Sequence, residues 1–194
     1  MEGTKDEYMT CLSGDRLVSK TQGRIVFRGL IDTLEAEVIE AQVLAAELGK
    51  NQEALGSLAP RSLNFCSCLG EILDYLRLVL ASEVKEKPLA PPFLFGMGPE
   101  EIHRRSHEAK VTGADGKAVP PSYFHGALAA RLNTLRARVR EAEIVAVKVF
   151  GPRDDSNKTE AENRGDIILA LNRLSSAFWW LFCECAKLTK EDPE

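Results

Sequence analysis

The fold is decided in residues 132–150, Leu-Asn-Thr-Leu-Arg-Ala-Arg-Val-Arg-Glu-Ala-Glu-Ile-Val-Ala-Val-Lys-Val-Phe. At the α-helical period of about 100° per residue, one apolar stripe runs through and just before this segment: Leu128, Leu132, Leu135, Val139 and Ala146. Arg136, Arg140 and Glu143 follow at positions i, i+4 and i+7, on a face that borders the stripe. Because a buried unpaired charge costs several kcal/mol, charges beside a core-facing stripe indicate a polyanion site between helices. A structural ion-pair network at an oligomer contact is the alternative, and spacing alone does not separate the two.

Composition limits the function classes. The chain has 194 residues, enough for one domain with a hydrophobic core. Its formal charge of −4 argues against a broad nucleic-acid surface, although a local basic pocket is compatible with it. No apolar run reaches the length of a membrane span, and we expect no signal peptide. Five cysteines, an odd number, then indicate reduced thiols in a cytoplasmic protein.

Helical periodicity recurs along the chain, whereas strand-like alternation is never sustained. The pattern predicts helices over residues 24–48, 62–86, 99–110, 125–150 and 166–189. We expect the first helix to end, and to be separated from the second, at Gly49, Gly56 and Pro60. The sequence therefore predicts an all-α protein, an antiparallel five-helix bundle of four long helices and one short one. We expect a flexible N-terminal segment at 1–23, the bundle domain at 24–189 and a tail at 190–194.

Two further helices carry polar side chains next to apolar ones. On the last helix, Asn172 clusters with Ser175, Ser176 and Trp179. An asparagine there either cross-links two helices or anchors a nucleotide. On the first helix, Asp32 lies in a second apolar face, which indicates contact with a neighbouring subunit and is formed by Ile25, Ala36, Ile39 and Val43. A carboxylate in that face needs a basic partner, and Arg136 is the candidate.

These motifs together resemble the ATP:cob(I)alamin adenosyltransferases, in particular their ethanolamine-utilisation branch. The resemblance consists of a Ser13-Gly14-Asp15 loop, Lys20, Gly29-x-x-Asp32, Arg136-x-x-x-Arg140-x-x-Glu143 and Leu171-Asn-Arg-Leu-Ser175, in this order. A Glu-x-x-His-Arg-x-Ser-His run at 100–107 is similar to the ethanolamine branch. The resemblance covers residues 9–189, and the combination is more specific than any single motif.

The resemblance implies a trimer of five-helix bundles that transfers the 5′-deoxyadenosyl group of ATP to reduced cobalamin. It implies ATP binding, with Mg²⁺, by residues 1–23 of the N-terminal segment together with the fourth and fifth helices, through Ser13, Gly14, Asp15, Lys20, Arg140, Glu143 and Asn172. It places Asp32 and Arg136 in a pair between subunits that shapes the corrinoid pocket, and makes Arg136, Arg140, Glu143 and Asp32 the catalytic set. An aromatic residue beneath the corrin is expected just before the fourth helix, at Phe124.

The resemblance also allows a reductase partner and association with a bacterial microcompartment. The alternative function is a non-catalytic helical bundle that binds a metal or a corrinoid as a carrier or scaffold. The sequence contains two Cys-x-Cys pairs, Cys66–Cys68 and Cys183–Cys185. We interpret them as reduced thiols, because cysteines two positions apart on a helix point to different faces and are poorly placed to bind the same metal ion. Glu100, His103 and His107 share a helical face but lack the second copy that di-iron bundles need, so no metal site is assigned.

Overall fold

The computed structural model describes residues 6–54, 63–113, 115–152 and 163–188. A two-stranded hairpin comes first, β1 (Met9–Ser13) and β2 (Arg16–Ser19). Five α-helices follow: α1 (Gly23–Ala54), α2 (Phe65–Val84), α3 (Pro99–Glu108), α4 (Gly126–Phe150) and α5 (Gly165–Ala186). A short 3₁₀ turn, η1 (Tyr123–His125), leads into α4.

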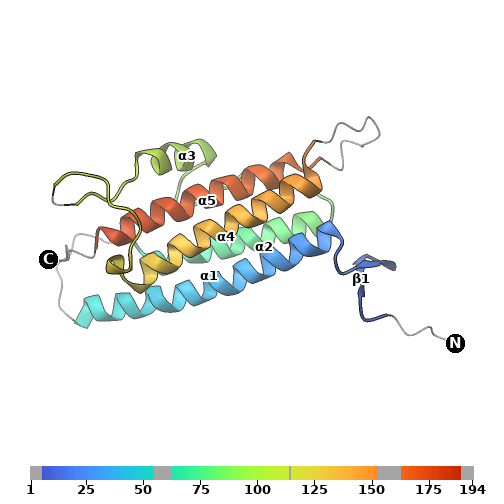
Figure 1. Cartoon of the computed structure of the whole chain (residues 1–194), viewed down its shortest axis with the longest axis horizontal. Helices are drawn as coiled ribbons and strands as arrows, with labels where there is room; N and C mark the ends of the chain where they lie inside the picture. The colour runs from blue at the N-terminus through green and yellow to red at the C-terminus, as the bar shows by residue number, and fades with distance from the viewer. Residues whose placement is uncertain (1–5, 55–62, 114, 153–162, 189–194) are drawn as a thin grey trace.

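The four long helices form an antiparallel bundle (Figure 1). α1 packs against α2 and α4, and α5 packs against α2 and α4, which closes the ring. The short α3 lies outside this ring, on the surface of α5. The all-α bundle of four long helices and one short helix is therefore confirmed for the described residues.

The core consists of the apolar stripes that the sequence predicts. Each of the four long helices turns one stripe inward, because burying apolar side chains is the main favourable term in folding. The main apolar stripe of α1, on the opposite side from the face of Asp32, is buried throughout: Phe27, Leu34, Val38, Ala41 and Ala45. So is that of α4: Leu128, Leu132, Leu135, Val139 and Ala146.

Helix ends agree with local chemistry, with one exception. The side chain of Asn64 caps α2 by accepting a hydrogen bond from the Ser67 N–H at 3.0 Å. Pro99 occupies the first turn of α3, where its missing N–H costs nothing. The expected break at Gly49 is wrong, because α1 continues through this glycine to Ala54, while the other two residues of the expected break, Gly56 and Pro60, lie outside the described residues. A single glycine costs a helix only about 1 kcal/mol, which the packing of α1 against its neighbours outweighs.

The hairpin was not expected from the sequence. Gly14, with φ of +50°, makes the turn, and the register shifts between Cys11 and Ser13, which is a β-bulge at Leu12. The bulge leaves Leu12 outside the ladder, and its side chain is only 3% exposed while most of the hairpin is exposed. The strands have five and four residues, too short for period-two alternation to stand out.

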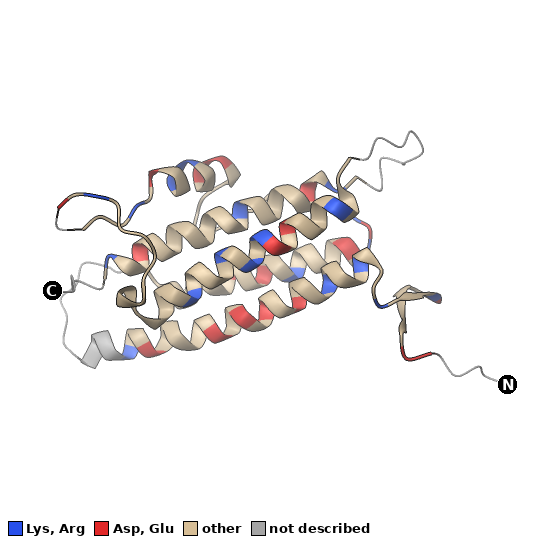
Figure 2. Cartoon of the chain, viewed as in Figure 1, with Lys and Arg blue, Asp and Glu red and all other residues tan. Residues whose placement is uncertain are grey.

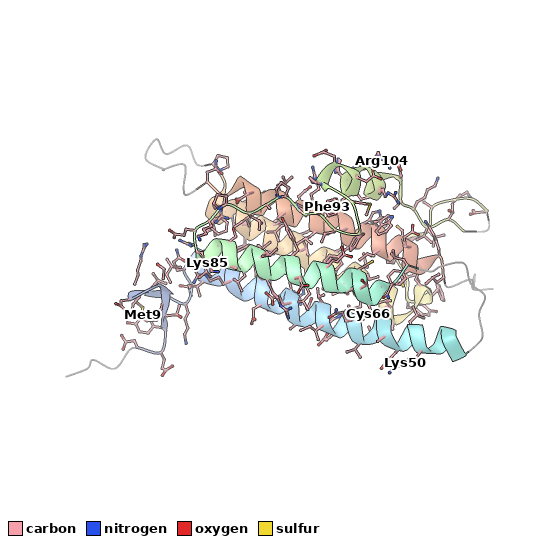
Figure 3. The ribbon with its side chains drawn as sticks, turned by 180° about the vertical axis from the view of Figure 1, so that it is seen from behind. Met9, Lys50, Cys66, Lys85, Phe93 and Arg104 are labelled. Carbon is pink, nitrogen blue, oxygen red and sulfur yellow. The ribbon has the colours of Figure 1, made fainter. Side chains whose placement is uncertain are left out.

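A buried ionic cluster fastens the hairpin to the bundle. Glu83, fully buried near the end of α2, accepts hydrogen bonds from Arg24 and, at 2.5 Å, from Arg28. Arg28 also donates to the backbone carbonyl of Leu12 at 2.7 Å. Burial alone would lower the pKa of Arg24, but its hydrogen bonds to Glu86 and Glu83 raise that pKa overall. In Figure 3 the hairpin around Met9 accordingly projects from the bundle end at which α2 stops, near Lys85.

Complementary charge lies between α1 and α4. Figure 2 shows acidic residues along the middle of α1 and basic residues along α4. Arg138 of α4 lies 3.4 Å from Glu37 of α1, and Arg131 pairs with Glu40. Arg138 therefore points toward α1, away from Arg136 and Arg140, as the helical spacing predicts.

Candidate functional site

A pocket of about 510 Å³ opens where α3, α4 and α5 meet. α4 contributes Arg136 and Arg140 to its wall, and α5 contributes Ser175, Ser176 and Trp179. The end of α3 and the loop before η1 complete the wall with Ser106, His107, Ala109 and Pro121. The two arginines that the spacing singled out therefore lie together at a cavity between packed helices.

The two arginines differ in how they are held. Arg136 is half-buried, donates to Asn133 Oδ1 at 3.1 Å and lies over the Trp179 ring at 5.5 Å from its centroid. Arg140, one turn later, is exposed and makes no ion pair with the described residues. A guanidinium without a carboxylate partner beside a cavity is suited to bind an anionic ligand. Among the described residues neither arginine has a carboxylate partner, so both are available to an anionic ligand or to a carboxylate of a neighbouring subunit.

Glu143 lies outside that pocket. With Ile144, Val147 and Lys148 it lines a neighbouring hollow of about 370 Å³ on α4. Its Oε1 accepts a hydrogen bond from Asn172 Nδ2 at 3.0 Å, so the pair links α4 to α5. Asn172 is exposed, and its Oδ1 accepts from Arg173 at 2.6 Å. The cross-linking role weighed for Asn172 is therefore present, and its exposed edge leaves room for a ligand as well.

Asp32 and Arg136 do not pair within the chain. Asp32 is exposed on α1 and makes no ion pair with the described residues, whereas Arg136 faces α5. Burial raises the pKa of Glu35, one turn from Asp32, and the Asp32 charge raises it further against the opposing effect of Arg77. Ile39 and Val43, on the same face as Asp32, are 47% and 55% exposed. The second apolar face of α1 is thus uncovered and carries Asp32, which has no cationic partner among the described residues.

The predicted nucleotide loop lies on the hairpin. Ser13, Gly14 and Asp15 form its exposed turn, and Lys20 follows β2. None of these residues lines the pocket of Arg136 and Arg140. Figure 1 shows why: the hairpin extends beyond one end of the bundle. Within one chain the candidate residues of α4 and α5 therefore lie close together, whereas the candidate nucleotide-binding residues of the N-terminal segment lie away from them.

Phe124 lies in η1, three residues after Pro121, and is not part of the pocket lining. Its ring packs on Tyr123 with centroids 4.0 Å apart, and the two side chains are 42% and 79% exposed. His125 closes the turn through a capping box with Ser122. The role of Phe124 beneath the corrin stays a prediction.

Comparison with known proteins identifies the family. The sequence model that describes cobalamin adenosyltransferases matches residues 1–185. This chain belongs to the cobalamin adenosyltransferase family. It is 32% identical over 175 residues to the corrinoid adenosyltransferase EutT of Salmonella typhimurium, and 31% identical over the same length to that of Escherichia coli K12. Each alignment covers 90% of this chain and 57% of the relative, so the chain spans little more than half the length of these relatives.

Sequence reasoning missed two features of this adenosyltransferase-family chain. The first is the buried ionic cluster. Glu83 follows Ile72, Leu76 and Val79 at the spacing of the buried face of α2. A charged residue at a buried position indicates a cationic partner, so this position could have predicted the cluster. His107 was noted only as part of a histidine pair, but it lines the arginine pocket. Its ring lies 4.5 Å from that of His103.

The structure of the described residues supports no chemical role for the other candidate groups, the cysteines and the histidines with nearby carboxylates. All five cysteines are free thiols; Cys66 is exposed, whereas Cys68, Cys183 and Cys185 are buried. Within the described ranges, no three His, Cys, Asp or Glu side chains come together as a metal-binding group. None of the described helices of this family member combines the length and apolarity that crossing a membrane requires.

Proposed function

We propose that this chain is a corrinoid adenosyltransferase of the ethanolamine-utilisation type. It transfers the 5′-deoxyadenosyl group of ATP to reduced cobalamin and forms adenosylcobalamin. The observation that carries the proposal is the pair Arg136 and Arg140, which lines one pocket without a carboxylate partner among the described residues. Family membership and the likeness to EutT proteins support the same reaction.

The chemistry needs positioning more than proton transfer. The electron pair of Co(I) forms a bond to the ribose 5′ carbon, and the bond from that carbon to the phosphate oxygen breaks. The pair of that bond leaves with triphosphate, so the cobalt becomes formally Co(III) and no general base is required. The protein holds the two reactants in line and stabilises charge on the departing phosphates.

Each residue has a role that its surroundings support. Arg140, exposed and unpaired among the described residues, binds the phosphates together with Lys20 and the backbone N–H groups of the Ser13–Asp15 turn. Asn172 binds the nucleotide from its exposed edge. Glu143 fits Mg²⁺ because this ion takes one or two carboxylates besides phosphate oxygens, and only one oxygen of Glu143 is engaged by Asn172. Bound there, Mg²⁺ would neutralise phosphate charge.

A homotrimer brings the separated parts together in this proposal. The hairpin of one copy reaches the pocket of the next, and Asp32 pairs with Arg136 across the contact to shape the corrinoid pocket, beneath which Phe124 lies. The exposed Ile39 and Val43 supply an apolar surface for that contact. Gly29 lies in the second turn of α1, and a Cβ added there would meet no side chain or other element of its own chain within 4 Å, so a close neighbouring subunit is a reason for glycine there.

The partners follow from the reaction. The cytoplasm or a bacterial microcompartment supplies ATP and the corrinoid, and a reductase delivers the cobalt in reduced form. The test is an assay with MgATP and chemically reduced cobalamin. We expect a product whose cobalt–carbon bond is cleaved by light. Corrinoid binding without this product would favour a carrier or scaffold instead.

A further inference from the structure

The pocket lined by Arg136 and Arg140, here called the arginine pocket, also has a nitrogen-bearing side chain that comes from α3. His107 is the penultimate residue of α3 and lines the pocket opposite the α4 arginines. Three contacts hold this part of the chain on α5: Trp179 donates to Ala109 O at 3.3 Å, Phe95 stacks on Trp180, and Arg173 lies 3.7 Å from Glu100. The position of His107 is therefore fixed by packing around it.

The acidic side chains of α3 are engaged away from the pocket. Glu101 accepts hydrogen bonds from Arg104 and Arg105, which lower its pKa to about 2. Glu108 accepts from Arg104 at 2.6 and 2.7 Å. Of the described residues that line the pocket, none carries a carboxylate. The lining thus offers guanidinium, imidazole and hydroxyl donors with no competing anion.

Such a lining selects a phosphate-bearing ligand. Guanidinium groups bind phosphate oxygens through paired N–H donors. An imidazole presents at least one N–H in either protonation state, and Ser175 and Ser176 add hydroxyl donors. The corrin ring, whose edge is mainly amides, does not need this concentration of cations.

We propose that His107 is a phosphate-binding residue, which donates a ring N–H to a phosphoryl group that Arg140 also binds. The inference rests on the proposed function, because two phosphates then enter the site. One is the triphosphate of ATP, and the other is the phosphodiester in the nucleotide loop of cobalamin. The chemistry of recognition is the same for both, and the experiment separates them.

The test compares His107→Ala with His103→Ala. His103 lies one turn earlier on α3, is exposed like His107 and touches its ring, but does not line the pocket. Calorimetry measures the affinity for tripolyphosphate, and steady-state assays give KM for ATP, for cobalamin and for cobinamide, which lacks the phosphodiester. Loss of a hydrogen bond to a charged group weakens binding roughly tenfold or more.

If the ATP phosphates are bound, His107→Ala weakens tripolyphosphate binding and raises KM for ATP. If the phosphodiester is bound, only KM for cobalamin rises, and cobinamide is unaffected. In either case His103→Ala stays within about twofold of the parent, His107→Lys restores binding and His107→Phe does not. Unchanged constants in His107→Ala, or equal losses in the two alanine variants, would overturn the inference. Histidine-dependent binding of tripolyphosphate without adenosylation would instead refute the proposed function and leave this inference standing.

Discussion

At the residue scale, Arg140 decides whether the pocket is a reaction site. It is exposed and lacks a carboxylate partner among the described residues, so its removal leaves no buried charge behind. We expect Arg140→Ala to fold normally and to reduce kcat/KM for adenosylation by roughly 10²-fold or more, because a preorganised donor to developing charge is lost. The assay is formation of the light-sensitive product.

The matched control is Arg138→Ala. Arg138 is also an exposed arginine of α4, but it pairs with Glu141 at 3.0 Å on the side facing α1. This variant should keep its activity within about twofold, since exposed ion pairs contribute about 1 kcal/mol or less. If Arg138→Ala and Arg140→Ala lost activity equally, the activity would depend on the total positive charge of α4 and not on the position of Arg140 in the pocket.

The cysteines give a second prediction for single residues. Burial raises the pKa of Cys68, Cys183 and Cys185 to about 11, whereas Cys11 and Cys66 are exposed. Because the thiolate is the reactive form, a disulfide reagent at pH 8 should label no more than two thiols quickly. The buried three should react only after unfolding. Cys66→Ser should remove one fast thiol, and a third fast thiol in the parent would contradict this packing.

Much of the site could be predicted residue by residue, since helical spacing alone places Arg136 and Arg140 on one side of α4. Spacing also predicts that Ser175, Ser176 and Trp179 cluster on α5, and these three side chains line the same pocket. It could not place His107, because α3 is a short helix whose docking depends on long-range contacts such as Phe95 on Trp180. Nor could it separate Glu143 from the pocket, because a helical face does not specify where a cavity ends.

At the element scale, the junction of the hairpin, α1 and α2 depends on Glu83. Its carboxylate is fully buried and bonded to both Arg24 and Arg28. Removing one partner of a buried ion pair leaves uncompensated charge, at a cost of about 3–5 kcal/mol. We therefore expect Glu83→Ala to lower the free energy of unfolding by that amount in urea titrations.

Glu86→Ala is the comparison for this junction. Glu86 binds the same Arg24 at 2.6 Å, but its side chain is 63% exposed. Its loss should cost about 1 kcal/mol or less. If the two variants were equally stable, Glu83 would not be the residue that holds the hairpin on the bundle.

The helices were predictable as elements because each long one has a continuous apolar stripe. The hairpin was not, because its strands are short and its anchoring comes from Arg28, sixteen positions beyond Leu12. The helix α1 also extends past Gly49, since propensity at one residue is weaker than packing along a helix of 32 residues. Local sequence patterns therefore predict the helices, whereas they do not predict contacts between charged residues that are far apart in the sequence.

At the scale of the whole molecule, the exposed face of α1 predicts assembly. Val43 is 55% exposed beside Ile39 and Asp32 on this face. If this surface joins neighbouring copies, Val43→Glu buries a charge there and should convert the proposed trimer to monomers. Sedimentation analysis measures the change, and adenosylation should fall with it because the hairpin and pocket then separate.

Leu78→Glu is the control for this prediction. Leu78 is exposed to a similar degree, 57%, but lies on α2 and not on the α1 face of Asp32. Leu78→Glu should leave the proposed trimer and the activity unchanged. A monomeric parent protein that is fully active would contradict the proposed assembly.

The adjacent tryptophans of α5 give this chain two separate optical and magnetic probes. Trp179 lies in the pocket beneath Arg136, whereas Trp180 stacks on Phe95 in the segment before α3. Since the chain has two tryptophans in all, labelling with 5-fluorotryptophan yields two fluorine resonances. The Trp180 resonance then reports movement of the segment before α3, whereas the Trp179 resonance reports ligand entry together with the contact to Ala109. Comparing the two resonances separates ligand entry from movement of α3.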